Sequence, residues 1–213
     1  MDARVYIIMS SVIVIVTTLI SFIVSIASQR NKYREIIAFD ISTDHMNELE
    51  NHIKMFLSKN SLSINSSIDE IGSKLNVFRG EASDEINCQA YLNPADKDGK
   101  MYVTFKKGLS NAVKNFDFAH ECAHILNNDG APNTRADTED KPEIEQIADY
   151  TAAALLMPFD SISKKLDASN YINIRPAKRW KVIQDLCKEY NVSEIIVLRR
   201  IKEIYALKTK MSV

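Results

Sequence analysis

The chain has 213 residues, a formal net charge of −1 and 46% hydrophobic residues, which suits one well-packed domain with an appendage. This balance excludes a protein that is polybasic as a whole, and the low glycine and proline content excludes a disordered chain. The cysteines Cys88, Cys122 and Cys187 are odd in number and far apart, which favours a reducing compartment over a disulfide-bonded secreted domain.

The first element is an apolar segment over residues 5–27 that carries no charge and is rich in Ile and Val. At about 1.5 Å per residue, a helix of this length crosses a hydrocarbon layer of ~30 Å, so we expect a transmembrane helix. A signal peptide is the alternative, but the stretch is longer than a typical signal core. Arg30, Lys32 and Arg34 follow it, so we expect a single-pass membrane protein whose C-terminal body is cytoplasmic.

Residues 28–65 are expected to form a juxtamembrane connector followed by a helix over 44–59, where apolar residues recur at helical spacing. Ser66 or Ser67 is predicted to cap the next, short helix. Glu70 stands three residues after Ser67, as in a capping box.

Two strands are predicted next, over 85–92 and 100–105, with the polar segment 93–99 as the turn that makes them a small antiparallel sheet. The second strand is rich in β-branched and aromatic residues, and we expect an extended substrate to pair with its edge.

The remaining elements are predicted to be helices. Ser110 or Asn111 caps one that ends near Asn127, another covers 143–157, and three more follow over 160–207. The predicted fold is therefore α+β and mainly helical. It divides into the transmembrane helix over 5–27, the connector and helix over 28–65, a core over 66–158 and a C-terminal helical region over 159–213.

The chemistry is concentrated in His120-Glu121-Cys122-Ala123-His124, an HExxH pattern on a predicted helix. Neutral imidazole is a good zinc ligand, and histidines four residues apart on a helix face the same way. His120 and His124 are therefore predicted to bind Zn²⁺. Glu121 is long enough to reach a water at the metal and is predicted to be the general base. The alternative is two surface histidines on an amphipathic helix.

A catalytic zinc usually has three protein ligands, and no histidine follows His124. The third ligand is therefore expected among Glu143, Glu145 and Asp149 on the next helix. Glu145 and Asp149 lie one turn apart, which suits Glu145 as the ligand and Asp149 as the acceptor that orients a ligand histidine. Glu143 stands at the helix start, where a carboxylate often only complements the helix dipole.

Two segments, His120–Leu126 and Glu145–Pro158, together resemble the ImmA/IrrE family of metallopeptidases. The Ala-rich second helix with its Leu-Leu-Met-Pro ending matches closely, whereas Ile147 replaces a family glutamate and Asp149 replaces an asparagine. The resemblance implies a zincin-like core with Glu145 as third ligand. It also implies cleavage of a protein substrate inside the cell, often a helix-turn-helix repressor.

The function expected from the sequence is thus a membrane-anchored zinc metallopeptidase acting on a protein, with a transcriptional repressor as the expected substrate. The alternative is a membrane-tethered regulatory module that binds a protein and keeps a structural or inactive zinc site. Residues 175–210 carry ten basic and four acidic side chains. Such a surplus is more often a solvated face than a DNA contact, so direct nucleic-acid binding is not expected.

Overall fold

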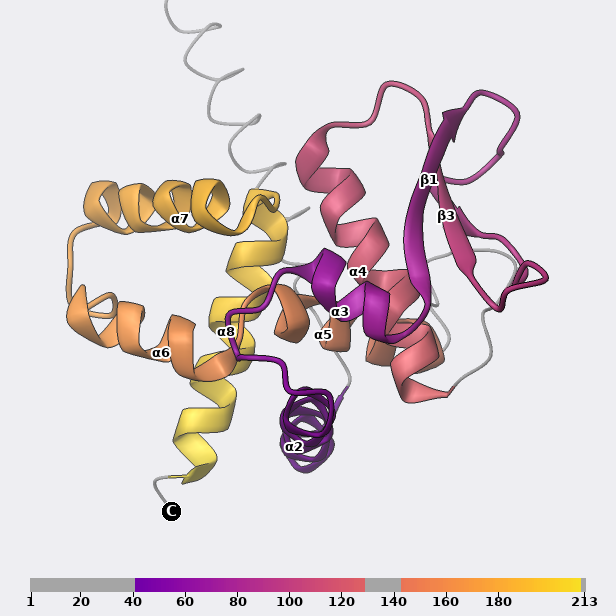
Figure 1. Ribbon diagram of the computed structural model, residues 1–213. Helices are drawn as coiled ribbons and strands as arrows, with labels where there is room; N and C mark the ends of the chain where they lie inside the picture. Colours follow the sequence, from indigo (N-terminus) through magenta and orange to yellow (C-terminus); the bar gives the residue numbers. More distant parts are fainter. Residues whose placement is uncertain (1–40, 129–142, 212–213) are drawn as a thin grey trace, which may run out of the picture. The chain divides into compact units, whose positions relative to one another are not determined.

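Seven helices and one small sheet make up the part of the chain that the structure describes, a computed structural model of residues 41–128 and 143–211 (Figure 1). In chain order the elements are α2 (Thr43–Lys59), α3 (Ile68–Lys74), β1 (Val77–Ser83), β2 (Ala90–Leu92), β3 (Met101–Lys106), α4 (Asn111–Asn127), α5 (Glu143–Leu156), α6 (Phe159–Ala168), α7 (Pro176–Tyr190) and α8 (Glu194–Met211). The predicted class, α+β and mainly helical, is confirmed.

The sheet has the strand order β1-β3-β2 and is mixed. β2 and β3 pair antiparallel, as predicted, with Tyr91 opposite Thr104. β1 pairs parallel to β3, with Val77 opposite Met101, so the prediction of a purely antiparallel sheet is wrong. Because β3 lies between two partners, the prediction that a substrate pairs with its edge is also wrong. The strands at the edges are β1 and β2.

Capping residues at the helix starts explain why three of the helices begin where they do. The Ser67 hydroxyl accepts from the Glu70 N–H at 3.2 Å, and the Glu70 carboxylate accepts from the Ser67 N–H at 2.8 Å, which completes the predicted capping box of α3. Ser110 caps α4 and Ser42 caps α2 with a single bond each, in which the serine side-chain oxygen accepts from a backbone N–H three residues later.

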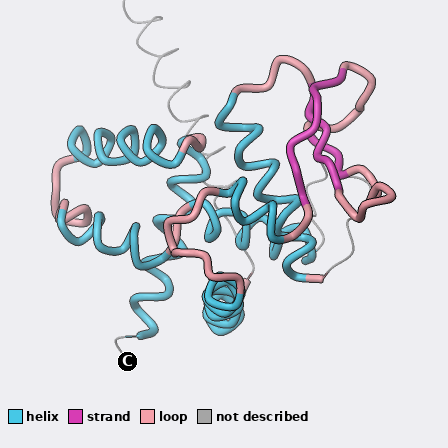
Figure 2. The backbone as a smooth tube through the Cα atoms, in the orientation of Figure 1, coloured by secondary structure: helices cyan, strands magenta, loops and turns pink. Residues whose placement is uncertain are grey.

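The core is built from two clusters of buried side chains, one joining the sheet with α2–α5 and the other joining α6–α8. Figure 2 shows the strands gathered on one side of α4 and the helices α6–α8 on the other. α4 and α5 pack closely against each other. α5 is also rich in small buried side chains, with four alanines that are each at most 1% exposed: Ala148, Ala152, Ala153 and Ala154.

The predicted transmembrane helix over 5–27 lies outside the described residues. Within residues 41–128 and 143–211, no helix is both long and apolar enough to cross a membrane. Even α8, with 18 residues, carries charged side chains such as Arg199, Arg200 and Glu203 within its span. This finding contradicts the prediction of a single-pass membrane protein.

Candidate metal centre

Three of the predicted site residues meet where α4 packs on α5. His120 and His124 stand one turn apart on α4, and Glu145 stands in the first turn of α5. One ligand atom from each residue can be chosen so that all lie within 4.8 Å of one another. All three side chains are buried, with 2%, 1% and 3% of their surface exposed.

The distances between these atoms suit a tetrahedral metal ion. The two histidine Nε2 atoms are 3.0 Å apart, and Glu145 places one carboxylate oxygen 3.2 Å from His120 Nε2 and the other 3.5 Å from His124 Nε2. Zinc bonds to nitrogen and oxygen of about 2.0–2.1 Å, set at tetrahedral angles, separate the ligand atoms by about 3.3 Å. The two histidine nitrogens and the nearest carboxylate oxygen to each therefore lie close to the spacing that such an ion requires.

Asp149 lies against the other ring nitrogen of His120. Its Oδ1 lies 2.9 Å from His120 Nδ1 and accepts the proton that this nitrogen carries. In the neutral imidazole, Nε2 then has no proton, and its lone pair faces the Glu145 carboxylate and the His124 ring. Two acceptors at this distance repel unless a cation lies between them, either a second proton on His120 or a metal ion. The donor set thus fits Zn²⁺.

The same contact affects the charge of Glu145. When the cation is a second proton on His120 Nε2, the hydrogen bond that it donates holds the pKa of the Glu145 carboxyl below its usual range, against the opposing effect of burial. Glu145 therefore keeps its negative charge at neutral pH and can bind a cation.

The remaining candidates are placed clearly. Glu121 lies on α4 next to His120 and is 8% exposed, and Asp149 lies one turn after Glu145 and is 3% exposed. Glu143 is an exposed residue at the start of α5, as a dipole-complementing carboxylate would be. The roles of ligand, base and orienting acceptor remain predictions.

Cys122 adjoins the histidines but has the properties of a packing residue. Its side chain is fully buried, and desolvation raises the pKa of its thiol far above the usual range, so it stays a neutral thiol. The ligand atoms that converge on the candidate centre come from His120, His124 and Glu145, and not from this sulfur. Cys122 therefore belongs to the core around the site.

The sequence reasoning missed a buried set of charges behind the site. Arg199 of α8 donates from Nη1 to Asp149 Oδ2 at 3.1 Å, and its Nε donates to Glu203 at 3.0 Å. Arg200 bonds Glu203 and also Glu50 of α2. The expectation that the basic C-terminal surplus is a solvated face is wrong for these two arginines, which are 9% and 0% exposed. The signal that could have indicated their burial is their position among apolar residues of a helix.

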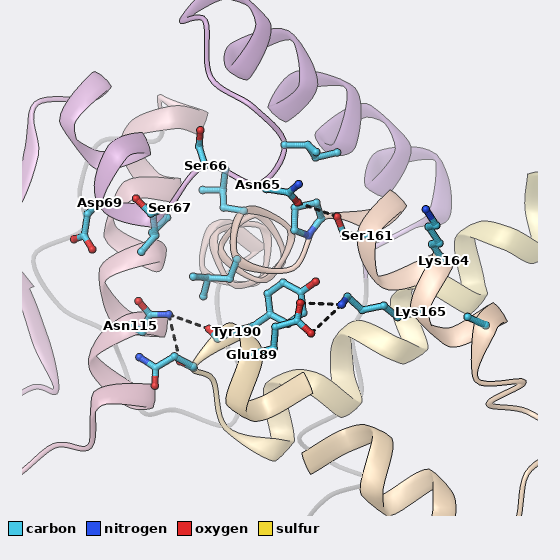
Figure 3. A pocket seen from close by; sticks show the side chains of 17 residues that line it. Asn65, Ser66, Ser67, Asp69, Asn115, Ser161, Lys164, Lys165, Glu189 and Tyr190 are labelled. Atoms are coloured by element: carbon cyan, nitrogen blue, oxygen red, sulfur yellow. Dashed lines mark hydrogen bonds and ion pairs between the residues drawn. The ribbon is translucent and has the colours of Figure 1, made fainter. Parts of the chain in front are cut away.

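A separate cavity of about 800 Å³ lies between the segment before α3, the end of α5, α6 and the end of α7 (Figure 3). Lys165 and Glu189 of its lining form an ion pair at 2.8 Å, and Asn115 donates to the backbone oxygens of Tyr190 and Asn191. None of the three candidate metal ligands lines it. Several of its polar groups pair within the lining, among them Ser161 with Asn65, and we assign no chemistry to it.

Comparisons with known proteins agree with this geometry. The sequence model of the IrrE N-terminal-like domain, a peptidase family designated M78, matches residues 91–202, which include both histidines and α5. A solved structure, a Mycobacterium tuberculosis transcriptional regulator, superposes with a TM-score of 0.50 at 14% identity, over 79% of this chain and 50% of the regulator. The chain thus spans about half of that protein's length, and the likeness concerns the fold alone. A search of curated proteins finds no significant match.

Proposed function

We propose that this chain, which belongs to the family of IrrE N-terminal-like domains of M78 peptidases, is a zinc-dependent peptidase whose metal is held by His120, His124 and Glu145. The observation that carries the proposal is the buried cluster of ligand groups. The two Nε2 atoms are 3.0 Å apart on α4, the helix that also bears Glu121, and each lies within 3.2–3.5 Å of an oxygen of Glu145 on α5. A carboxylate beside two such histidines is the arrangement that metal-assisted peptide hydrolysis needs.

Each side chain then has one task in the reaction. His120 and His124 bind through Nε2, and Asp149 keeps the proton of His120 on Nδ1 so that Nε2 can bind. When bound, zinc supplies the Lewis acidity that peptide hydrolysis requires. Glu121 takes a proton from the attacking water and returns it to the departing amine. Glu145 supplies the negative charge that holds the cation in a buried site.

The proposed substrate is a protein, and more narrowly a helix-turn-helix transcriptional repressor. The support for this is the resemblance to the ImmA/IrrE family, which implies cleavage of such regulators. The substrate class therefore rests on family membership.

The test compares the zinc-loaded full chain with its Glu121→Gln variant, using as substrate the helix-turn-helix repressor encoded nearest to it. Glu121→Gln keeps the side-chain shape and removes the base, so we expect full zinc binding and loss of cleavage, read by mass spectrometry of the products. Glu143→Gln is the matched control, because it removes an exposed carboxylate from the neighbouring helix and should cleave normally. Normal cleavage by Glu121→Gln contradicts the mechanism. Zinc binding without cleavage by the wild type contradicts the peptidase and indicates a binding module.

A further inference from the structure

The Asp149 carboxylate is held from both sides. Oδ1 lies 2.9 Å from His120 Nδ1, and Oδ2 accepts from the Arg199 guanidinium at 3.1 Å. All three residues are buried, with 2%, 3% and 9% of their surfaces exposed for His120, Asp149 and Arg199. With one oxygen fixed by each partner, the carboxylate cannot rotate away from the imidazole without breaking a charge-assisted hydrogen bond in a site from which water is largely excluded.

The guanidinium of Arg199 is itself fixed by a second carboxylate. Its Nε donates to Glu203 Oε1 at 3.0 Å, and the other oxygen of Glu203 lies 3.3 Å from Arg200 Nη1. Arg200 continues the chain of contacts to Glu50 of α2, at 2.6 Å, and donates from Nε to the backbone oxygen of Met157 at 2.9 Å. The network therefore ties together α8, α2 and the residue after α5, helices that pack against one another (Figure 1). Arg199 is its member that bonds Asp149, beside the candidate ligands.

This arrangement is costly for a contact that only packs helices. Taking charged groups out of water costs several kcal/mol per ion, and well-packed apolar residues of similar volume often replace such pairs without loss of stability. Burial alone would lower the pKa of Arg199, yet Glu203 and Asp149 raise it above its usual value, so the guanidinium stays charged. A permanent charge is thus kept next to Asp149 although helix packing does not require one.

We propose that Arg199 is a positioning residue of the metal centre, which acts through Asp149 to hold the tautomer and orientation of the ligand His120. The inference rests on the proposed zinc site. Arg199 touches no ligand atom, and its effect requires the planar fork that serves Asp149 and Glu203 at once. A lysine keeps the charge but presents a single ammonium, which cannot satisfy both carboxylates in this geometry.

The first experiment compares the zinc affinity of Arg199→Lys and Arg200→Lys in the full chain, measured by competition with a chromogenic chelator. Arg200 is the matched control, because it is the next residue on α8, is more deeply buried and also bonds Glu203, but makes no contact with Asp149. Loss of an outer partner of a ligand histidine weakens metal binding about 10–100-fold. Because Arg199 stands one contact farther out, we expect a loss of about three- to tenfold for Arg199→Lys and less than about twofold for Arg200→Lys.

The second experiment separates positioning from general damage to the fold. If Arg199 acts through Asp149, Arg199→Lys should weaken zinc binding in the wild-type background and change nothing further in an Asp149→Asn background. The visible spectrum of the Co²⁺-loaded proteins should show the altered ligand field in Arg199→Lys and the wild-type spectrum in Arg200→Lys. Equal losses of affinity in the two lysine variants, or additive losses in the double variant, would overturn the proposal.

These readouts need no substrate, so the inference and the proposed peptidase can fail separately. A wild type that binds zinc tightly and cleaves no repressor, together with the affinity pattern above, overturns the peptidase and supports the positioning role. Cleavage that depends on Glu121, combined with equal affinities for Arg199→Lys and Arg200→Lys, supports the peptidase and overturns the positioning role.

Discussion

Replacing Glu145 with glutamine tests whether this carboxylate is a metal ligand or only a buried polar group. The change keeps the size of the side chain and removes the charge that faces His120 Nε2 at 3.2 Å and His124 Nε2 at 3.5 Å. A zinc site releases about 10–16 kcal/mol on binding, so one of three protein ligands carries about 3–5 kcal/mol. We therefore expect zinc affinity to fall by about two to four powers of ten.

The metal-free protein should respond far less. Glu145→Gln loses one buried hydrogen bond to a charged group, which costs about 1.5–3 kcal/mol of unfolding free energy. The pKa of Glu145 is lower in the folded chain than the ordinary glutamate pKa of 4.5. The charged Glu145 therefore stabilises the fold at a pH above 4.5, and this stabilisation is lost as the pH falls through the lowered pKa. The difference in stability between wild type and variant should therefore be largest at neutral pH and vanish in acid.

The assay is chelator competition for zinc affinity, paired with urea unfolding of the metal-free chains over a range of pH. Glu143→Gln is the control, since it removes an exposed carboxylate two residues away on the same helix and should match the wild type in both measurements. The reasoning is refuted if Glu145→Gln binds zinc within about threefold of the wild type, a change far smaller than any ligand loss, or if Glu143→Gln shows the larger defect.

Two further predictions concern the structure around the site. Gly72→Ala should lower the free energy of unfolding by about 1–3 kcal/mol in urea titrations, because the new methyl group would lie 2.8 Å from Phe118 Cζ and 2.8 Å from the Val77 backbone oxygen. The opposing gain in helix propensity is about 1 kcal/mol, and a stabilised variant would contradict this packing. Cys122 should resist iodoacetamide in the native protein in mildly alkaline buffer and react in the urea-unfolded chain, since burial raises its thiol pKa and excludes the reagent. Rapid native labelling of Cys122, located by peptide mass spectrometry, would show that it is accessible.

The helices and their starts could be predicted because their signals are local. The capping box of Ser67 and Glu70, and the cap at Ser110, depend on residues three apart, which one sequence displays directly. β1 could not be found in this way. Its middle residues Arg79, Gly80 and Glu81 interrupt the alternation of a strand, and its only fully buried side chain is Val77. The strand exists because β3 pairs with it in parallel, which is a long-range contact.

The same difference between local signals and long-range contacts applies to the candidate site. His120 with His124, and Glu145 with Asp149, are pairs one helical turn apart, so the sequence alone predicted which side chains face the same way. The structure adds that α4 and α5 bring the two pairs together. Arg199 was missed because its contact with Asp149 joins residues fifty positions apart and exists only once α8 packs beside α5. The apolar neighbours of Arg199 on α8 indicate burial, but no local pattern identifies Asp149 as its partner.

The most direct test of the central claim is the zinc X-ray absorption spectrum of the zinc-loaded chain. The account predicts a four-coordinate site of nitrogen and oxygen ligands at about 2.0–2.1 Å, with the scattering signature of two imidazoles and no sulfur. A sulfur ligand at about 2.3 Å, or a site without imidazole scattering, would contradict the assignment of His120, His124 and Glu145 as the zinc ligands.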